Sequence, residues 1–550
     1  MNAVAISKIK NNKNLFFSGV AVLTFTNVLN KVIGVLFRIP ISNMLGDSGM
    51  AYFNAAYHIY TWFYMLSTGG LPLAVSMLVS EARFKGNREE IKRIYKISMR
   101  LFFAVGAVGT TLMIVFSKGF AHMNGVSDSY VSIIAVAPTL FLVCIASAMR
   151  GYFQGFQEMR PTAVSQIMET AGKLVMGIIF ARYALSQGYG LHIVAAYAIS
   201  GLTIGTAFGM LFLFISKLRF HEENYRVEGV LETAEVHKVR SVKSIVKQLL
   251  LIAIPITISS SIMSLTTMVD DMIINWRLMS IGYTEAAANA LYGNYTGFAV
   301  PFANLPPALI YPISYSLIPL LKGTLTIGDR DRSVEICKRS LKITALISIP
   351  CTVGICVMSE PLLRLIYNAD SSKLAAKPLS ILSLSIFFVC MLSISNAVLQ
   401  AHGKQNLPII SLVAGSVVKM ISSFILIGIP EIGIYGAPIS TVICYVVITV
   451  FNVYFMSKYT GVTPKVFRTF FKPLVASVIS MAGAFGTLCL LETRMQGKLV
   501  TVLAVAAAAV IYFIALIVLR GIDDDDIKMF PKGDRILESL QKIGLFKSKG

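Results

Sequence analysis

Four positively charged residues within long apolar stretches are the part of this sequence best suited to chemistry. Lys31 and Arg38 are about two helical turns apart, which places them on one face of a helix. Lys173 and Lys419 each lie near the middle of an apolar stretch. A charge at that depth of a bilayer costs roughly 2.5–3.5 kcal/mol or more unless it is paired or hydrated. In a water-filled cavity these cations would select an anion such as a phosphate or pyrophosphate headgroup.

Two of these cations also have a plainer interpretation. Arg38 lies near the end of its apolar stretch, so its guanidinium could extend to the membrane surface. Glu169 precedes Lys173 by one helical turn, so the two could form an ion pair within one helix. Lys419 has no such neighbour, which favours a position facing a cavity.

An acidic pair, Asp270-Asp271, lies toward the end of another apolar stretch, close to Arg277. It predicts either an ion or gating site or an interfacial ion pair. The ion would be a coupling ion, Na⁺ or H⁺. The alternative energy source is the membrane potential alone.

Catalytic motifs are missing from the sequence. It contains no P-loop, no HExxH and no GxSxG, so we expect neither an enzyme nor a nucleotide-driven motor, and no cofactor. The seven cysteines form no CxxC pattern, which argues against a zinc site and against disulfides.

Composition predicts an all-α polytopic membrane protein. Hydrophobic residues make up 55% of the 550 residues, charged residues make up 14%, and the mean hydropathy is +0.70. A soluble protein of this length would need far more charge to cover its surface. We expect fourteen transmembrane helices, each long enough to cross ~30 Å of hydrocarbon. They are residues 14–41, 52–82, 93–117, 129–154, 161–183, 191–216, 246–276, 285–321, 335–358, 376–402, 406–428, 433–457, 468–491 and 498–520.

The distribution of positive charge predicts the orientation in the membrane. Most of the 49 Lys and Arg residues fall on one side if the N-terminus is cytoplasmic, so both termini are expected there. The net charge of +21 is then a topology signal, aided by anionic membrane lipids, and does not indicate nucleic-acid binding.

The chain repeats itself. Gly86-Asn87-Arg88-Glu89 returns as Gly328-Asp329-Arg330-Asp331, and Lys173 matches Lys419 at nearly the same offset. Many transporters consist of two such halves with the substrate site between them. The expected divisions are an N-lobe of spans 1–6 (1–216), a cytoplasmic linker (217–245), a C-lobe of spans 7–12 (246–457), spans 13 and 14 (458–520) and a cytoplasmic tail with an amphipathic helix (521–550).

The second and eighth spans are both interrupted. Span 2 carries Gly69-Gly70-Leu71-Pro72, and span 8 carries several prolines, among them Pro312. Such breaks persist in lipid only where protein or a watery cavity satisfies the freed backbone groups. Gly70, Pro72 and Pro312 are therefore gating candidates, the alternative being simple packing kinks.

The chain resembles the polysaccharide-biosynthesis flippases of the multidrug/oligosaccharidyl-lipid/polysaccharide (MOP) superfamily, in the branch of stage V sporulation protein B and the lipid II flippases. The resemblance covers essentially the whole chain and rests on TGGLPLAVSMLVSEARFKGN (68–87), MRGYFQGFQEMRPTAVSQIME (149–169) and ALYGNYTGFAVPFANLPPALIYPISYSLIPLLKG (290–323). It implies a MATE/MurJ-like fold with two pseudo-symmetric six-helix lobes plus two C-terminal helices. It also implies alternating access and export of an undecaprenyl-pyrophosphate-linked precursor across the bacterial cytoplasmic membrane. We expect a monomer.

The resemblance also suggests substrate-binding residues. Lys31 falls where the related lipid II flippases carry a first-helix arginine, and Arg38 is displaced by one residue from a second. A cavity arginine is replaced in span 2, where His58 is the candidate cation, and Asn294 stands in the region of another. The set expected to bind pyrophosphate is Lys31, Arg38, His58, Lys173, Asn294 and Lys419.

Two other functions remain open. A cation-coupled multidrug exporter of the same superfamily would need carboxylates facing the N-lobe cavity, where this half offers chiefly cations and Glu169. A membrane enzyme that polymerises glycans would need larger outer loops than this sequence allows. We therefore expect a flippase for lipid II or a close lipid-linked oligosaccharide, serving growth or sporulation.

Overall fold

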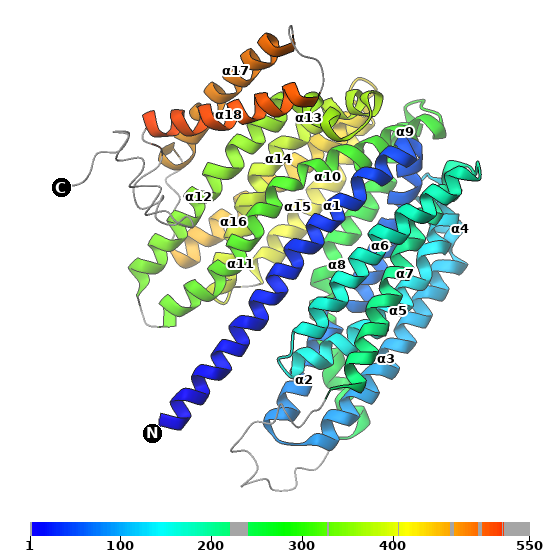
Figure 1. Ribbon diagram of the computed structural model, residues 1–550, viewed down its shortest axis with the longest axis vertical. Coiled ribbons are helices and arrows are strands. Elements are labelled where there is room, and N and C mark those ends of the chain that lie inside the picture. Colours follow the sequence, from blue (N-terminus) through cyan, green and yellow to red (C-terminus); the bar gives the residue numbers. More distant parts are fainter. Residues whose placement is uncertain are drawn as a thin grey trace, which may run out of the picture. The chain divides into compact units, whose positions relative to one another are not determined.

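The structure is a computed structural model that describes residues 3–220, 240–326, 329–404, 406–461, 467–492, 498–519 and 521. Within these residues every regular element is a helix, which confirms the predicted all-α fold class (Figure 1). Contacts divide the chain into two compact units, Met1–Gly297 and Phe298–Gly550, called here the first and second unit. The division into two six-helix lobes stays a prediction. Most of the expected linker and tail lies outside the described residues.

The first unit is a bundle of long helices. Its elements are α1 (Ala3–Thr68), α2 (Leu71–Phe84), α3 (Arg88–Val115), α4 (Ser117–Met123), η1 (Ser127–Ser129), α5 (Tyr130–Gly155), α6 (Arg160–Ser186), α7 (Leu191–Leu218), α8 (Val242–Ser280) and α9 (Glu285–Asn294). α7 packs against both α6 and α5, and α5 also packs against α3 (Figure 1). α1 packs against α5 to α9, so it lies at the centre of the contacts in this unit.

α1 joins the first two predicted spans without a loop. The segment expected to separate them stays helical except at Gly46, whose backbone angles are φ 62° and ψ −165°. A positive φ of this kind is readily adopted by glycine because it has no Cβ. The chain therefore changes direction within α1, and Arg38 and Asn54 lie on opposite arms of this kink.

Small residues bring α6 and α7 into close contact. A Cβ added at Gly205 would lie 2.3 Å from the carbonyl oxygen of Glu169 and 2.7 Å from the backbone nitrogen of Lys173. Gly201 and Gly209, one turn before and one turn after Gly205, approach the α6 backbone in the same way. Gly201, Gly205 and Gly209 thus form a stripe of small residues that serves close helix packing and fixes the part of α6 that carries Glu169 and Lys173.

Both predicted interruptions are confirmed. Gly69 and Gly70 separate α1 from α2. The eighth predicted span is divided into α9, the π-helix η3 (Tyr295–Ala299), α10 (Val300–Ala303) and α11 (Leu305–Thr326). The boundary between the two compact units falls inside this second interruption.

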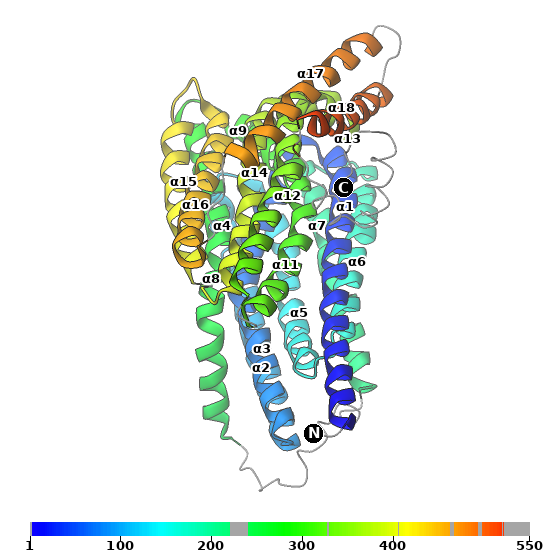
Figure 2. The same ribbon diagram turned by 90° about the vertical axis from the view of Figure 1, so that its left-hand side faces the viewer.

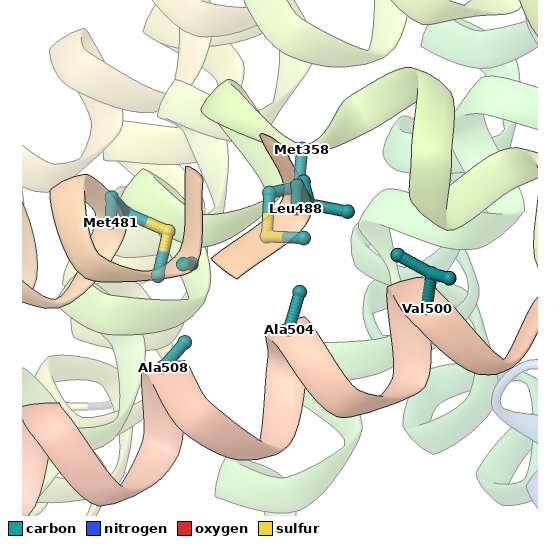
Figure 3. Close-up of a cluster of buried hydrophobic side chains, with 7 residues drawn as sticks. Met358, Met481, Leu488, Val500, Ala504 and Ala508 are labelled. Carbon is teal, nitrogen blue, oxygen red and sulfur yellow. The ribbon is translucent and has the colours of Figure 1, made fainter. Parts of the chain in front are cut away.

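The second unit is also a helical bundle. It continues with α12 (Arg330–Val357), α13 (Ser359–Ile366), α14 (Ala369–Ala401), α15 (Leu407–Ile427), η4 (Gly433–Tyr435), α16 (Gly436–Thr460), the π-helix η5 (Phe467–Phe471), α17 (Lys472–Glu492) and α18 (Lys498–Val518). α14 packs against α12 and α16, and α15 packs against α16 (Figure 2). Met358, Met481 and Val500 belong to a buried cluster that joins α17 and α18 to the end of α12 (Figure 3). The two additional C-terminal helices therefore belong to this unit.

Twelve helices of the described residues are long and apolar enough to cross a membrane. One of these stretches, Val32–Arg83, runs through the first two predicted spans because α1 stays helical between them. The eighth predicted span is broken into pieces and does not count as one long helix. The number of fourteen spans stays a prediction.

Candidate functional site

Lys173 lies between two aromatic rings. It projects from α6, and its ammonium is 4.8 Å from the centre of the Phe37 ring and 4.7 Å from that of the Tyr57 ring, both on α1. The electron-rich faces of the rings stabilise a cation that has left water. Within the described part of the chain, no carboxylate forms an ion pair with this ammonium. Lys173 therefore keeps its positive charge available to an anion.

Glu169 forms its ion pair with a different partner from the one its spacing suggested. Its carboxylate is 2.8 Å from the guanidinium of Arg150 on α5, and the two side chains are 17% and 8% exposed. Arg150 Nε also donates to Ser165 Oγ at 3.1 Å. The alternative of a Glu169–Lys173 pair is wrong, because the adjacent helix offers a buried guanidinium while Lys173 turns toward the rings of α1.

Arg38 is held by the protein itself. One of its terminal nitrogens donates to Asn54 Oδ1 at 2.7 Å and to the carbonyl oxygen of Thr296 at 2.8 Å. Asn54 Nδ2 in turn donates to Thr296 Oγ1 at 3.0 Å. The guanidinium also lies 6.0 Å from the centre of the Phe53 ring. These contacts join both arms of the kinked α1 to the π-helix η3.

Asn294 makes a second contact of this kind. Its amide nitrogen donates to Asp47 Oδ1 at 3.2 Å, and its side chain is almost fully buried. A Cβ added at the preceding Gly293 would lie 1.9 Å from the carbonyl oxygen of Asp47, so the backbones touch. Asn294 therefore helps to fix α9 against α1 next to the Gly46 kink.

His58 and Asp271 form a close pair between α1 and α8. His58 Nδ1 contacts Asp271 Oδ2, with His58 22% exposed and Asp271 4% exposed. Asn275 Nδ2 donates to the backbone oxygens of Asp271, at 3.3 Å, and of Asn124, at 2.8 Å. The neighbouring Asp270 is buried as well. An imidazole and a buried carboxylate thus meet within the bundle, with a second buried carboxylate next in the chain.

Tyr292 on α9 lies between this pair and Arg38. It is fully buried and near Asp271, Asp270 and Arg38. Tyr57 lies between His58 and Lys173. Its ring centre is 6.4 Å from that of His58, and the Lys173 ammonium lies over the face of the same ring. The first unit therefore contains one neighbourhood of charges, reaching from Arg38 through His58 to Lys173.

The gating candidates lie at close backbone contacts. The Gly70 amide donates to Thr257 Oγ1 at 3.0 Å, and a Cβ at Gly70 would lie 2.2 Å from the carbonyl oxygen of Ala253 on α8. Pro72 lies in the first turn of α2, and its own carbonyl would be 2.6 Å from a Cβ at Gly151. Pro312 lies on α11 in the second unit, and its side chain is outside the described set.

For two of the predicted cations, Lys31 and Lys419, the structure gives fewer contacts. Lys31 lies on α1, but its side chain is outside the described residues. Lys419 lies on α15 in the second unit, is half-buried, and interacts electrostatically with Tyr445 on α16. The expected partnership of Lys31 and Lys419 with the cations of the first unit stays a prediction.

Sequence reasoning missed several residues of this neighbourhood. Arg150 lies close to the end of a predicted span, where the sequence marks it as no more than a charge at the membrane surface, although it is buried on α5. Phe37 and Asn54 are ordinary residues of an apolar helix, and nothing in their spacing marks them. One signal in the sequence could have identified the Arg150–Glu169 pair. The two opposite charges lie in consecutive predicted spans, 129–154 and 161–183.

An all-helical fold with many candidate spans and charged side chains among them is typical of a polytopic membrane protein. The family model described as "Polysaccharide biosynthesis protein" matches residues 16–324, and the chain belongs to this family. A second model, described as "MatE", matches residues 255–425. Both families lie in the MOP superfamily that the sequence resembles.

Characterised relatives match over nearly the whole chain. Stage V sporulation protein B of Bacillus subtilis (strain 168) is 25% identical over 96% of this chain and 99% of its own length. The lipid II flippase MurJ of the same organism is 25% identical over 90% of this chain and 93% of its own length.

Solved structures share the fold. A lipid II flippase MurJ in an inward closed conformation superposes with a TM-score of 0.68 at 14% identity, over 90% of this chain and 98% of that one. A multidrug resistance transporter of the MATE family in an inward-facing conformation gives a TM-score of 0.63 at 14% identity, over 80% of this chain and 98% of that one. The predicted MATE/MurJ-like fold is thereby confirmed.

Proposed function

We propose that this protein flips lipid II, or a related undecaprenyl-pyrophosphate oligosaccharide, from the inner to the outer leaflet of the cytoplasmic membrane by alternating access. The observation that carries the proposal is Lys173, a cation of the first unit that faces two aromatic rings and has no carboxylate partner among the described residues. A pyrophosphate headgroup would supply the negative counter-charge that this lysine lacks among the described residues.

Separation of charge roles supports this proposal. Arg150 is neutralised by Glu169, and Arg38 already donates to Asn54 and Thr296. Lys173 is therefore the binding residue of the first unit in our proposal, and Arg38 positions the helices around it. Lys31 and Lys419 would add further contacts to the headgroup, while the prenyl chain stays in the lipid.

The relatives support the same substrate class. One of them is named as a lipid II flippase, and the matching family model is described as a polysaccharide biosynthesis protein. A lipid-linked saccharide combines both descriptions. The headgroup would cross the membrane with the membrane potential or an ion gradient as the energy source.

Replacement of Lys173 tests the proposal. The full-length protein is expressed in cells depleted of their own lipid II flippase, and lipid II exposed at the outer surface is measured. Lys173→Ala should reduce exposure at least tenfold at equal expression, and Lys173→Arg should retain more of it because the charge is kept.

A matched control uses a lysine with the same kind of contact elsewhere. Lys377 in the second unit lies 4.3 Å from the centre of the Tyr435 ring but is exposed at the start of α14. Lys377→Ala should leave exposure of lipid II unchanged. A normal amount of lipid II at the outer surface with Lys173→Ala would contradict the proposed role of this residue. Absence of lipid II at the outer surface with the unmodified protein would contradict the proposed substrate.

A cation-coupled multidrug exporter is the second candidate. It is favoured by the match of residues 255–425 to the MatE model and by the buried carboxylates Asp270 and Asp271. This function predicts resistance to cationic drugs in cells that express the protein, with loss of resistance in Asp271→Asn. Lipid II exposure without drug resistance would favour the flippase.

A further inference from the structure

The contact between His58 and Asp271 joins two helices that are far apart in sequence. His58 lies on the second arm of α1 and Asp271 lies on α8, and the carboxylate is buried. Histidine is the side chain whose ordinary charge change falls between pH 5 and 8. A histidine in contact with a buried carboxylate, within a bundle of candidate membrane-spanning helices, is a candidate for reversible proton binding.

We propose that His58 and Asp271 form a proton-binding site that is linked to the binding of an anionic headgroup at Lys173. The inference rests on the proposed function, because it assumes that an anion binds there. It adds that the anion and the proton bind with positive cooperativity and that H⁺ is the ion to which the transporter responds.

The groups around His58 define its electrostatic surroundings. α8 contributes Asp271 in direct contact and the buried Asp270, and α9 contributes Tyr292, which interacts with both carboxylates. α6 contributes Lys173, whose ammonium shares the Tyr57 ring. Three other charged groups lie further along the bundle and are already engaged with one another or with polar groups: Arg38 with Asn54 and Thr296, and Arg150 with Glu169.

Charge accounting gives the direction of the linkage. With the imidazole neutral and Asp271 ionised, the pair carries one negative charge. Proton uptake on the imidazole makes the pair neutral and adds one positive charge to the neighbourhood of Lys173. An anion at Lys173 therefore binds more tightly when the pair holds the extra proton, and by reciprocity binding of the anion favours proton uptake by the pair.

The distances make this coupling measurable. The Lys173 ammonium is 4.7 Å from the Tyr57 ring centre, and that centre is 6.4 Å from the His58 ring centre. The two cationic groups are thus within about 11 Å of each other. At an effective dielectric constant near 20, a unit charge about 10 Å from an anion changes its affinity by roughly tenfold.

Binding of undecaprenyl pyrophosphate to the full-length protein in lipid nanodiscs tests the inference. Affinity is measured from pH 5.5 to 8.0, and proton uptake on addition of the probe is followed with a pH indicator in weak buffer. His58→Gln serves as the reference because the titration of the probe itself is common to both proteins. The unmodified protein should gain about tenfold more affinity than His58→Gln on acidification.

Proton uptake provides a readout that needs no variant at His58. The unmodified protein should take up protons when the probe binds, and Lys173→Ala should not, because its anion site is lost. Probe binding without proton uptake, or the same pH profile in His58→Gln, would overturn the inference and leave the flippase proposal intact. An affinity that follows Na⁺ in place of pH would also overturn it. Absence of probe binding at every pH would overturn the flippase proposal as well.

Discussion

Ion pairs and other contacts of charged side chains join several helices of the first unit, whereas many of the interhelical contacts described in the second unit are made by hydroxyls and amides. In the first unit Arg150 contacts Glu169, His58 contacts Asp271, and Arg38 contacts Asn54. In the second unit the corresponding interhelical contacts include Ser314 with Ser393 at 2.7 Å, Ser423 with Ser440 at 2.6 Å, and Asn452 with Asn396 at 2.6 Å.

The two units therefore hold their helices together by different chemistry. Charges in a membrane bundle are expensive unless each has its partner, whereas interhelical hydrogen bonds between neutral groups contribute only about 0.6 kcal/mol on average. The first unit therefore concentrates the interactions whose loss is costly. In our proposal it is also the unit that binds the anionic headgroup and the proton.

The largest effect should come from breaking the buried ion pair of the first unit. Glu169→Ala leaves the Arg150 guanidinium buried without its carboxylate, which costs about 3–5 kcal/mol of stability. Thermal unfolding of the purified full-length protein in detergent should show a marked decrease in the midpoint temperature.

A double variant distinguishes lost charge pairing from lost packing. Arg150→Met with Glu169→Leu replaces both charges by apolar groups and should recover most of the stability, because a well-packed apolar pair is often as stable as a buried ion pair. A double variant that is no more stable than Glu169→Ala would show that this pair stabilises the bundle in another way.

An intermediate effect is expected at the contact between α6 and α7. Gly205→Ala places a Cβ 2.3 Å from the Glu169 carbonyl oxygen, which forces the two helices apart and costs about 1–3 kcal/mol. The displacement also moves the backbone of Lys173, so exposure of lipid II should decrease together with thermal stability.

Gly34 provides the matched control for that experiment. It lies on α1, and a Cβ there meets no described atom within 4 Å. Gly34→Ala should leave stability equal or slightly raised, because alanine favours the helix. Equal losses in Gly34→Ala and Gly205→Ala would argue against close packing as the cause.

The smallest effect is expected in the second unit. Ser314→Ala removes the hydroxyl contact between α11 and α14 and should cost about 0.6 kcal/mol. The same unfolding measurement applies. A loss as large as that of Glu169→Ala would abolish the contrast between the two units.

Local patterns were sufficient wherever the physical cause is local. Apolar stretches predicted the all-helical fold, Gly69-Gly70 predicted the break before α2, and the prolines predicted the break within the eighth span. The glycine stripe of α7 has an equally local cause, because small residues are needed wherever two backbones approach. Each of these features follows from hydration or backbone sterics of neighbouring residues.

Partners between helices were decided by the tertiary structure. The sequence supplied Glu169 with Lys173 as a neighbour one turn away, but packing of α5 against the bundle brought Arg150 into contact with the carboxylate and left Lys173 to the rings of α1. His58 and Asp271 stand more than two hundred residues apart, so no periodicity relates them. Sequence alone identified most of the charges that lie within apolar helices, Arg150 excepted, because burial cost depends on residue type. Only the packing of the helices determined which of those charges are neutralised and which stays available for a ligand, because pairing depends on distances of a few ångströms between separate helices.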